Sequence, residues 1–186
     1  MELQEWVNGS FQETDTDYKI AGKNILYKNE IEFLPKGVEL LCKKLKPKSV
    51  LEFGFGMGWT ETEFQKQGVT RHVILEPNIE LYQAALTWKA NYSTNIDILN
   101  IWSWDYIGGE TFDLVYDDRE PVTYEDFDKH FINMKTILPS TQLYAYNACK
   151  SYEKTFNYAI KFTLNNIEYG QTLTKGFHGT AIYKSR

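Results

Sequence analysis

Three glycines at alternate positions, Gly54, Gly56 and Gly58, follow a short apolar run and give the clearest chemical signal in the sequence. Glycine lets a strand turn sharply into a helix and leaves room for a ligand to approach the backbone. An acidic residue, Glu76, ends the next run of strand-forming residues, where a carboxylate can accept both hydroxyl groups of a ribose. The spacing predicts a nucleoside-binding site. The alternatives are a structural turn for the glycines and a solvent-facing strand end for Glu76.

Other residues of this site come from the strand before the glycines and from the end of the third strand. Glu52 lies in an otherwise apolar run, where a buried carboxylate needs hydrogen-bond partners, so we expect it to fix the glycine loop or to reach the ligand through water. Trp102 offers an aromatic face for a purine base, with core packing as the alternative. The residues expected at the cofactor are Glu52, Gly54, Gly56, Met57, Gly58, Glu76, Trp102 and Ser103.

The reacting end of the site is expected where the fourth strand ends, at Asp117. Open α/β folds bind ligands at this carboxyl edge of the sheet. A carboxylate there can accept a proton from an attacking nitrogen or hold a cationic substrate in line, which makes Asp117 the catalytic candidate. Capping of the following helix is its alternative role. Asp117 and Asp118 could also supply metal ligands, but the sequence offers no clear third ligand and we predict no metal site.

Alternating patterns of strands and helices position these residues. Strands are expected at 49–53, 72–76, 95–100, 112–117, 142–147, 167–173 and 177–183. Helices are expected at 30–45, after the glycine loop to about 67, and at 78–89, 123–138 and 152–165. Helices between successive strands imply parallel pairing through right-handed crossovers. Only three residues separate the last two strands, so a tight hairpin makes them antiparallel.

The expected architecture is a Rossmann-like α/β fold of the class I methyltransferase type. It has a mostly parallel seven-stranded sheet with a C-terminal antiparallel hairpin and helices on both faces, whereas a dehydrogenase would continue with another crossover. Residues 1–186 are expected to form one domain. Residues 1–29, called here the N-terminal arm, mix polar and aromatic side chains, which predicts an irregular segment or short helices that cover the active site.

Composition excludes several classes of protein. The net charge of -5 argues against a protein that coats nucleic acid, because phosphate binding depends on clustered cations. Cys42 and Cys149 have neither the spacing nor the neighbours of a disulfide framework or zinc site. No apolar run approaches the roughly 18 residues that a membrane helix needs. We expect a cytoplasmic protein with no nucleic-acid or membrane partner.

From about Ile31 to Tyr152 the chain resembles the guanidinoacetate N-methyltransferases, a family that includes related arginine N-methyltransferases. The likeness rests on the Val-Leu-Glu-x-Gly-Phe-Gly-Met motif at 50–57, on Ile101-Trp102, and on Phe112-Asp113 followed by Tyr116-Asp117, Pro121, Val122 and Glu125. The resemblance implies S-adenosylmethionine as the cofactor. It also implies that Glu76 binds the ribose, that Trp102 stacks on the adenine and that Asp117 lies beside the nitrogen to be methylated.

The family also pairs a glutamate ahead of the first helix with the substrate guanidinium. Glu32 is the nearest match and the second catalytic candidate, but the register slips by one residue, so Glu30 is an alternative. Two carboxylates around a guanidinium would form fork-like hydrogen bonds and orient one nitrogen toward the methyl donor. The chain departs from the family in the extra charge at 118–120, in the turn at 139–141 and in its shorter N-terminal arm, so the substrate does not follow from the resemblance.

The predicted function is S-adenosylmethionine-dependent N-methylation of a small cationic amine or guanidine, with a peptide substrate left open. O-methylation and aminopropyl transfer are alternatives on the same fold, although aminopropyltransferases usually carry an acid where this chain has Met57 and Trp59. A non-catalytic interaction module is the alternative from another class, since the aromatic arm could serve an interface. A homodimer that completes the site is also left open.

Overall fold

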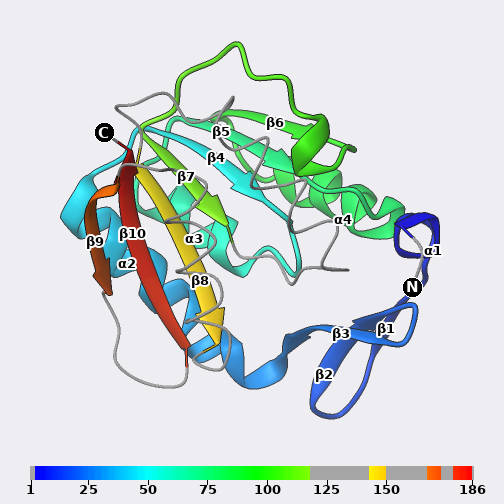
Figure 1. The fold of residues 1–186 in the computed structure, drawn as a ribbon. Coiled ribbons are helices and arrows are strands. Elements are labelled where there is room, and N and C mark those ends of the chain that lie inside the picture. Colours follow the sequence, from blue (N-terminus) through cyan, green and yellow to red (C-terminus); the bar gives the residue numbers. More distant parts are fainter. Residues whose placement is uncertain (1–2, 118–142, 150–166, 173–177, 186) are drawn as a thin grey trace.

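The computed structural model describes residues 3–117, 143–149, 167–172 and 178–185 of the chain. Within these residues the strands form two sheets, a small antiparallel sheet near the N-terminus and a larger mixed sheet (Figure 1). The small sheet has the order β1-β2-β3 and the large sheet the order β6-β5-β4-β7-β8-β10-β9. The predicted Rossmann-like α/β architecture is confirmed by the large sheet and the helices packed on it.

Five strands of the large sheet pair in parallel, and the last two pair antiparallel to their neighbours. The parallel strands are β4 (Ser49–Phe53), β5 (Arg71–Leu75), β6 (Asn95–Leu99), β7 (Leu114–Asp117) and β8 (Leu143–Cys149). The antiparallel ones are β9 (Ile167–Thr172) and β10 (His178–Ser185). The chain runs from β4 outward to β6 and then returns to the other side of β4. The strand order therefore reverses between β4 and β7, where such sheets form a ligand crevice at their carboxyl ends.

The first predicted helix, 30–45, is two elements in the structure. A 3-10 helix, η1 (Lys28–Glu32), precedes α2 (Leu34–Leu45). Pro35 lies in the first turn of α2, where its missing N–H is tolerated, and a proline there favours a helix start and not a helix interior. Lys46, in the left-handed conformation, ends α2 ahead of Pro47.

Helices α2, α3 (Trp59–Lys66) and α4 (Ile79–Lys89) all pack on one face of the large sheet. Val38, Leu41 and Cys42 of α2 and Phe64 of α3 pack on β4 and β7, and Ala85 of α4 packs on β5 and β6. The strand residues on this face are Val50, Ile74, Ile96, Ile98, Leu114 and Tyr116. The helices predicted at 123–138 and 152–165 lie outside the described residues.

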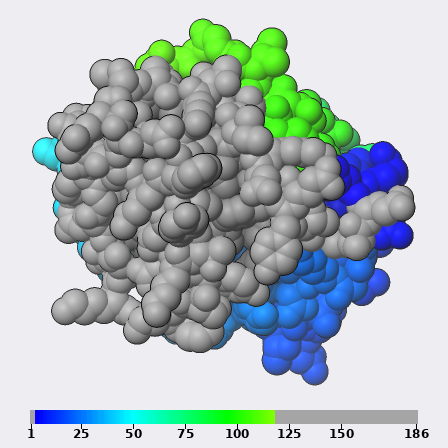
Figure 2. Space-filling view, in the orientation of Figure 1, coloured from blue at the N-terminus to red at the C-terminus, as the bar shows by residue number. Residues whose placement is uncertain are grey.

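The N-terminal arm, predicted as an irregular segment or short helices, contains a regular three-stranded sheet. After the short helix α1 (Leu3–Val7), β1 (Phe11–Glu13), β2 (Asp17–Ile20) and β3 (Lys23–Tyr27) form an antiparallel meander. The turn between β2 and β3 is Ala21-Gly22, and both residues have positive φ, as a type I′ hairpin turn requires. In Figure 2 the arm, in blue, forms one edge of the face shown.

The starts of β4 and β7 are fastened to each other by Asp113, the residue before β7. Its Oδ2 accepts the backbone N–H groups of Lys48 and Ser49 at 2.7 and 2.9 Å. Its own N–H donates to Oγ of Ser49 at 2.9 Å. These bonds set the register in which Phe53 pairs with Asp117 at the carboxyl ends of the two strands.

Candidate functional site

The glycine loop adopts backbone conformations that favour glycine at each of the three predicted positions. Gly54, Gly56 and Gly58 have φ values of 86°, 52° and 75°. A Cβ on Gly56 would lie 2.9 Å from Cδ1 of Leu26, and one on Gly58 would lie 3.0 Å from Cζ of Phe55. The first glycine is therefore needed for the turn after β4, and the other two also for close packing.

Glu76, directly after β5, points its carboxylate at the glycine loop. Oε2 accepts the backbone N–H of Phe55 at 2.9 Å and Oε1 accepts that of Asn78 at 2.8 Å. Only 3% of the residue is exposed, and burial raises the pKa of Glu76 to about 7 despite these backbone N–H donors. The structure thus brings the predicted ribose carboxylate and the predicted glycine loop into one hydrogen-bonded unit.

Glu52 is fully buried on the face of the sheet that carries the helices. Its Oε2 lies 2.7 Å from Nε2 of His72, and its Oε1 accepts the hydroxyl of Thr60 at 2.8 Å. Thr60 belongs to the first turn of α3, which begins directly after Gly58. The carboxylate therefore joins β4, β5 and the helical end of the glycine loop.

The segment after β6 carries Trp102 and Ser103 and is fastened to the segment after β5. The side chain of Asn100 donates to the backbone oxygens of Glu76 and Pro77 at 2.9 and 3.0 Å. Trp102 is partly buried and stacks on Trp104 with a centroid distance of 4.6 Å, and Ser103 is buried. The strand ends that carry the predicted ribose and adenine residues are thus adjacent.

Asp117 is the last residue of β7 and is 1% exposed. It pairs in register with Phe53, so it lies level with the start of the glycine loop. Alternate residues of a strand point to opposite faces, and Glu52 pairs with Tyr116, so Asp117 and Glu52 point to opposite faces of the sheet. Asp118 and Arg119 lie outside the described residues.

The two glutamates considered for substrate binding differ in their surroundings, although both belong to η1. Glu30 is 8% exposed and accepts the backbone N–H of Tyr27 at 2.7 Å. Burial raises the pKa of Glu30 above its usual range. Glu32, at the end of η1, is exposed to solvent.

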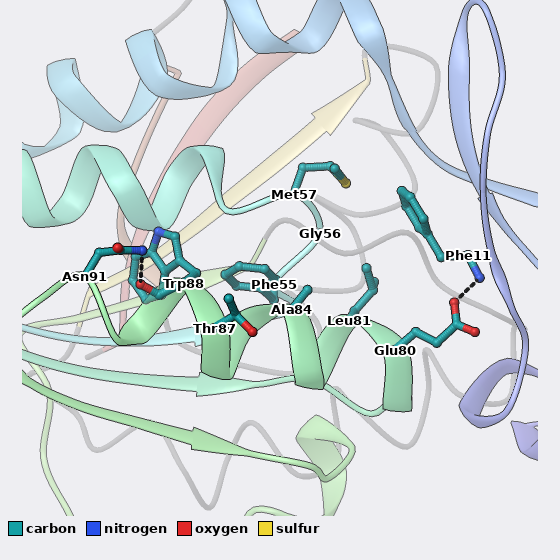
Figure 3. A pocket seen from close by; sticks show the side chains of 10 residues that line it. All are labelled: Phe11, Phe55, Gly56, Met57, Glu80, Leu81, Ala84, Thr87, Trp88 and Asn91. Carbon is teal, nitrogen blue, oxygen red and sulfur yellow. Dashed lines mark hydrogen bonds between the residues drawn. The ribbon is translucent and has the colours of Figure 1, made fainter.

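A pocket of about 520 Å³ lies between the N-terminal arm, the glycine loop and α4 (Figure 3). Its lining is mostly apolar and consists of Phe11, Phe55, Gly56, Met57, Glu80, Leu81, Ala84, Thr87, Trp88 and Asn91. Glu52, Glu76, Trp102 and Asp117 do not line it. The pocket therefore borders the glycine loop on the α4 side, and the predicted site residues in its lining are Gly56 and Met57.

Asn78 and Asn100 are hydrogen-bonded to Glu76, and the sequence patterns did not single them out. Asn78 caps α4 by accepting the backbone N–H of Leu81 at 3.1 Å, and an asparagine ahead of a helical pattern is a signal for this role. Its contacts to the N-terminal arm bridge about 70 positions of sequence, so no local pattern predicts them.

The described residues contain no group of three or more side chains that could hold a metal ion. Among the helices that the structure describes, none has both the length and the apolar character needed to cross a membrane.

Comparison with protein families matches residues 3–163 to the guanidinoacetate N-methyltransferases. No curated protein sequence matches the chain. Many solved structures share its fold. A ribosomal protein L11 methylase from Lactobacillus delbrueckii subsp. bulgaricus has a TM-score of 0.65 at 18% identity, over 87% of this chain and 82% of that one.

Two further structures with the same fold were solved with bound cofactor molecules. A 1,6-didemethyltoxoflavin-N1-methyltransferase from Burkholderia thailandensis, with S-adenosylhomocysteine, has a TM-score of 0.61 at 12% identity, over 82% of this chain and 77% of that one. A 16S rRNA N2 G1207 methyltransferase from T. thermophilus, with AdoMet and guanosine, has a TM-score of 0.58 at 14% identity, over 98% of this chain and 46% of that one. At these identities the likeness shows the fold alone.

Proposed function

The chain belongs to the guanidinoacetate N-methyltransferase family and is an S-adenosylmethionine-dependent methyltransferase, and we propose that it methylates a nitrogen of a small cationic amine or guanidine. The observation that carries the proposal is the arrangement at the carboxyl ends of β4, β5 and β7. The glycine loop, Glu76 and Asp117 follow or end these adjacent strands. The net charge of -5 also favours a cationic substrate.

The residues of the proposed cofactor site fit S-adenosylmethionine. Oε2 of Glu76 accepts the backbone N–H of Phe55 and Oε1 accepts that of Asn78, and each oxygen keeps lone-pair capacity for a ribose hydroxyl. The glycine loop would leave its backbone open to the methionine part of the cofactor at Gly54, Gly56, Met57 and Gly58. Glu52 would support the loop from the face of the sheet that carries the helices. Trp102 and Ser103 would border the adenine. S-adenosylmethionine, when bound, supplies a methyl group made electrophilic by its sulfonium.

Asp117 is the proposed catalytic residue. Its carboxylate would orient the attacking nitrogen and hold the proton that this nitrogen loses. Most of the rate would come from placing the nucleophile, since proximity and alignment contribute more than a single proton transfer. Burial of Asp117 at the carboxyl end of β7 supports this role, because a carboxylate binds a cation more strongly away from water.

The second substrate carboxylate is proposed to come from η1. Burial favours Glu30 over Glu32, because a shielded carboxylate gains more from pairing with a guanidinium than an exposed one. Glu32 remains the alternative that the family register suggests.

The proposal extends to the organisation of the whole chain. Residues 1–186 would form one catalytic domain whose seven-stranded sheet ends in an antiparallel hairpin, which the pairing of β8, β10 and β9 supports. The N-terminal arm would cover the active site. We propose a cytoplasmic enzyme for a small molecule, with a peptide substrate and a homodimer as alternatives.

Calorimetric titration with S-adenosylmethionine and S-adenosylhomocysteine is the first test, with NAD and decarboxylated S-adenosylmethionine as controls. We expect micromolar binding of the first two only. Transfer of a radiolabelled methyl group to panels of guanidines, amines, peptides and RNA then identifies the substrate class. Preference for the decarboxylated cofactor would indicate aminopropyl transfer. Binding without methylation of any guanidine or amine would contradict the proposed substrate class.

A further inference from the structure

The N-terminal arm is fastened to the first turn of α4, immediately after the proposed ribose carboxylate. The side-chain amide of Asn78 donates to the backbone oxygens of Trp6 and Gly9 at 2.7 and 2.9 Å. The backbone N–H of Phe11 donates to Oε2 of Glu80 at 2.7 Å, the dashed contact at the arm in Figure 3. Three hydrogen bonds therefore connect the arm to two residues of the same turn.

Asn78 is also bonded to the cofactor side of this junction. Its backbone N–H donates to Oε1 of Glu76, and its Oδ1 accepts the N–H of Leu81 as the cap of α4. The residue is fully buried. Because both N–H groups of an amide can donate, the two bonds to the arm use the whole donor capacity of the side chain. Asn78 is thus hydrogen-bonded to the carboxylate of Glu76, to the first turn of α4 and to the arm.

The arm contacts the other two cofactor segments as well. Leu26 of β3 lies against Gly56 so closely that a Cβ there would meet its Cδ1 at 2.9 Å. Tyr18 of β2 makes an edge contact with Trp59, directly after the glycine loop. Trp102 packs against the cluster formed by Trp6, Ile20 and Leu81. The arm therefore touches the segments that follow β4, β5 and β6.

We propose that Asn78 is a positioning residue that couples docking of the N-terminal arm to cofactor binding at Glu76, an inference that rests on the ribose role of Glu76 in the proposed function. A ribose held by Glu76 fixes the carboxylate to which the Asn78 N–H is bonded, and the amide of the same residue then holds Trp6 and Gly9. Coupling between two sites is reciprocal, so a bound cofactor protects the arm and a released arm weakens cofactor binding by the same factor.

The Asn78→Asp substitution tests this coupling without removing the helix cap. Aspartate still accepts the Leu81 N–H and is a favourable N-cap residue. The carboxylate cannot donate to the carbonyls of Trp6 and Gly9. Its second oxygen would instead face both carbonyl oxygens. We expect faster hydrogen–deuterium exchange in peptides from the arm and affinity for S-adenosylhomocysteine weaker by about tenfold. In the wild-type protein the same ligand slows exchange in the arm.

Asn91→Asp is the matched control. The side-chain amide of Asn91 also donates to a backbone carbonyl of α4, that of Trp88, at 3.0 Å. Asn91 is exposed, and within the part of the chain that the structure describes it makes no hydrogen bond to Glu76. This variant is expected to keep wild-type ligand affinity and wild-type exchange in the arm. Trp6→Ala provides a second variant that loosens the arm from its own side and leaves the cap of α4 intact, so it should also weaken ligand binding.

The possible outcomes separate the coupling from the proposed function. Wild-type ligand affinity in both Asn78→Asp and Trp6→Ala would overturn the coupling alone, as would arm exchange that the ligand leaves unchanged in the wild-type protein. Failure of the wild-type protein to bind S-adenosylhomocysteine would overturn both. Weaker binding and faster arm exchange in both variants, with neither change in Asn91→Asp, would support the coupling.

Discussion

The imidazole of His72 and the carboxylate of Glu52 form a 2.7 Å hydrogen bond between adjacent strands, and neither side chain is exposed to solvent. The amide of Gln65 lies 3.2 Å from Nδ1 of His72 and can donate to it, which leaves Nε2 to donate to Glu52. Thr60 donates to the other carboxylate oxygen. The carboxylate is thus satisfied by donors from α3 and β5.

Replacing Glu52 by Gln should destabilise the protein by about 3 kcal/mol, because the new amide N–H₂ would face a donor in a buried site. Urea unfolding followed by circular dichroism measures this loss. Glu39→Gln is the control, since Glu39 pairs with Lys36 and Lys43 on the surface of α2, where ion pairs contribute little to stability. Equal losses in the two variants would contradict a structural role for the buried network.

The raised pKa of Glu76 predicts a loss of stability as the pH rises. Burial raises this pKa from the ordinary 4.5 to about 7, so between these values the folded protein holds a proton that the unfolded chain releases. The free energy of unfolding contributed by Glu76 should therefore fall by about 3 kcal/mol across this window. Urea titrations at several pH values measure the slope, and Glu76→Gln should remove this component. An unchanged slope in that variant would exclude Glu76 as its source.

Cofactor affinity should depend on pH in the opposite direction. The ionised carboxylate accepts ribose hydroxyls, and protonation converts one of its oxygens to a donor. Affinity for S-adenosylhomocysteine is therefore expected to fall as the pH drops below about 7, by up to about tenfold per pH unit. Calorimetry from pH 5.5 to 8 tests this, with Glu76→Gln binding weakly and independently of pH. A flat wild-type profile would argue against the ribose role.

Asp117→Asn should lower turnover by roughly 10²- to 10⁴-fold, because the amide cannot take the proton of the nucleophile. Affinity for S-adenosylhomocysteine should stay close to that of the wild-type protein. Single-turnover methyl transfer and calorimetry measure the two quantities separately. Wild-type turnover in this variant would reject the catalytic assignment.

The two glutamates of η1 should respond differently to substitution. Glu30→Gln removes the buried charge and is expected to lower kcat/KM for a cationic substrate by roughly 10- to 100-fold, chiefly through KM. Glu32→Gln changes an exposed side chain and should leave both constants near their wild-type values. Steady-state kinetics with the substrate identified by the methyl-transfer screen measures both constants. The reverse pattern would assign substrate pairing to Glu32.

Gly58 and Gly22 allow conformational strain to be separated from close packing. Both have a φ of 75°, so alanine at either position costs roughly 1–2 kcal/mol in backbone strain. A Cβ on Gly58 would also meet Phe55 and Trp88, at 3.0 and 3.3 Å, whereas one on Gly22 meets nothing within 4 Å. Thermal unfolding should therefore show a larger loss for Gly58→Ala. The loss of cofactor affinity should also be larger for Gly58→Ala, because Gly58 belongs to the glycine loop itself.

The central part of the fold follows from local sequence patterns. Strands β4, β5 and β6 are short apolar runs bounded by turn residues, and the glycines between β4 and α3 are required by the positive φ values there. Glu76 is recognisable because it follows a strand at the same end as the glycines. Such features depend on a few neighbouring residues, so they can be predicted without the tertiary structure.

The N-terminal arm could not be predicted in the same way. Its strands have three to five residues, and its hairpin turn is Ala21-Gly22 in place of the Asn-Gly or Asp-Gly pair that signals a type I′ turn. Which η1 glutamate is buried also depends on long-range packing. The side-chain amide of Asn78 donates to Trp6 and Gly9, which come about 70 positions earlier in the sequence, and only the folded structure brings them together.

The bonds of Asp113 to the start of β4 also constrain how the chain length can vary. From Ser49 to Phe53 and from Asp113 to Asp117 the two strands advance by the same number of residues, in parallel register. A deletion of one residue within β7 would turn Asp117 to the face that carries the helices, because side chains alternate between faces. Relatives of this chain should therefore vary in length between β6 and β7, and not between Asp113 and Asp117.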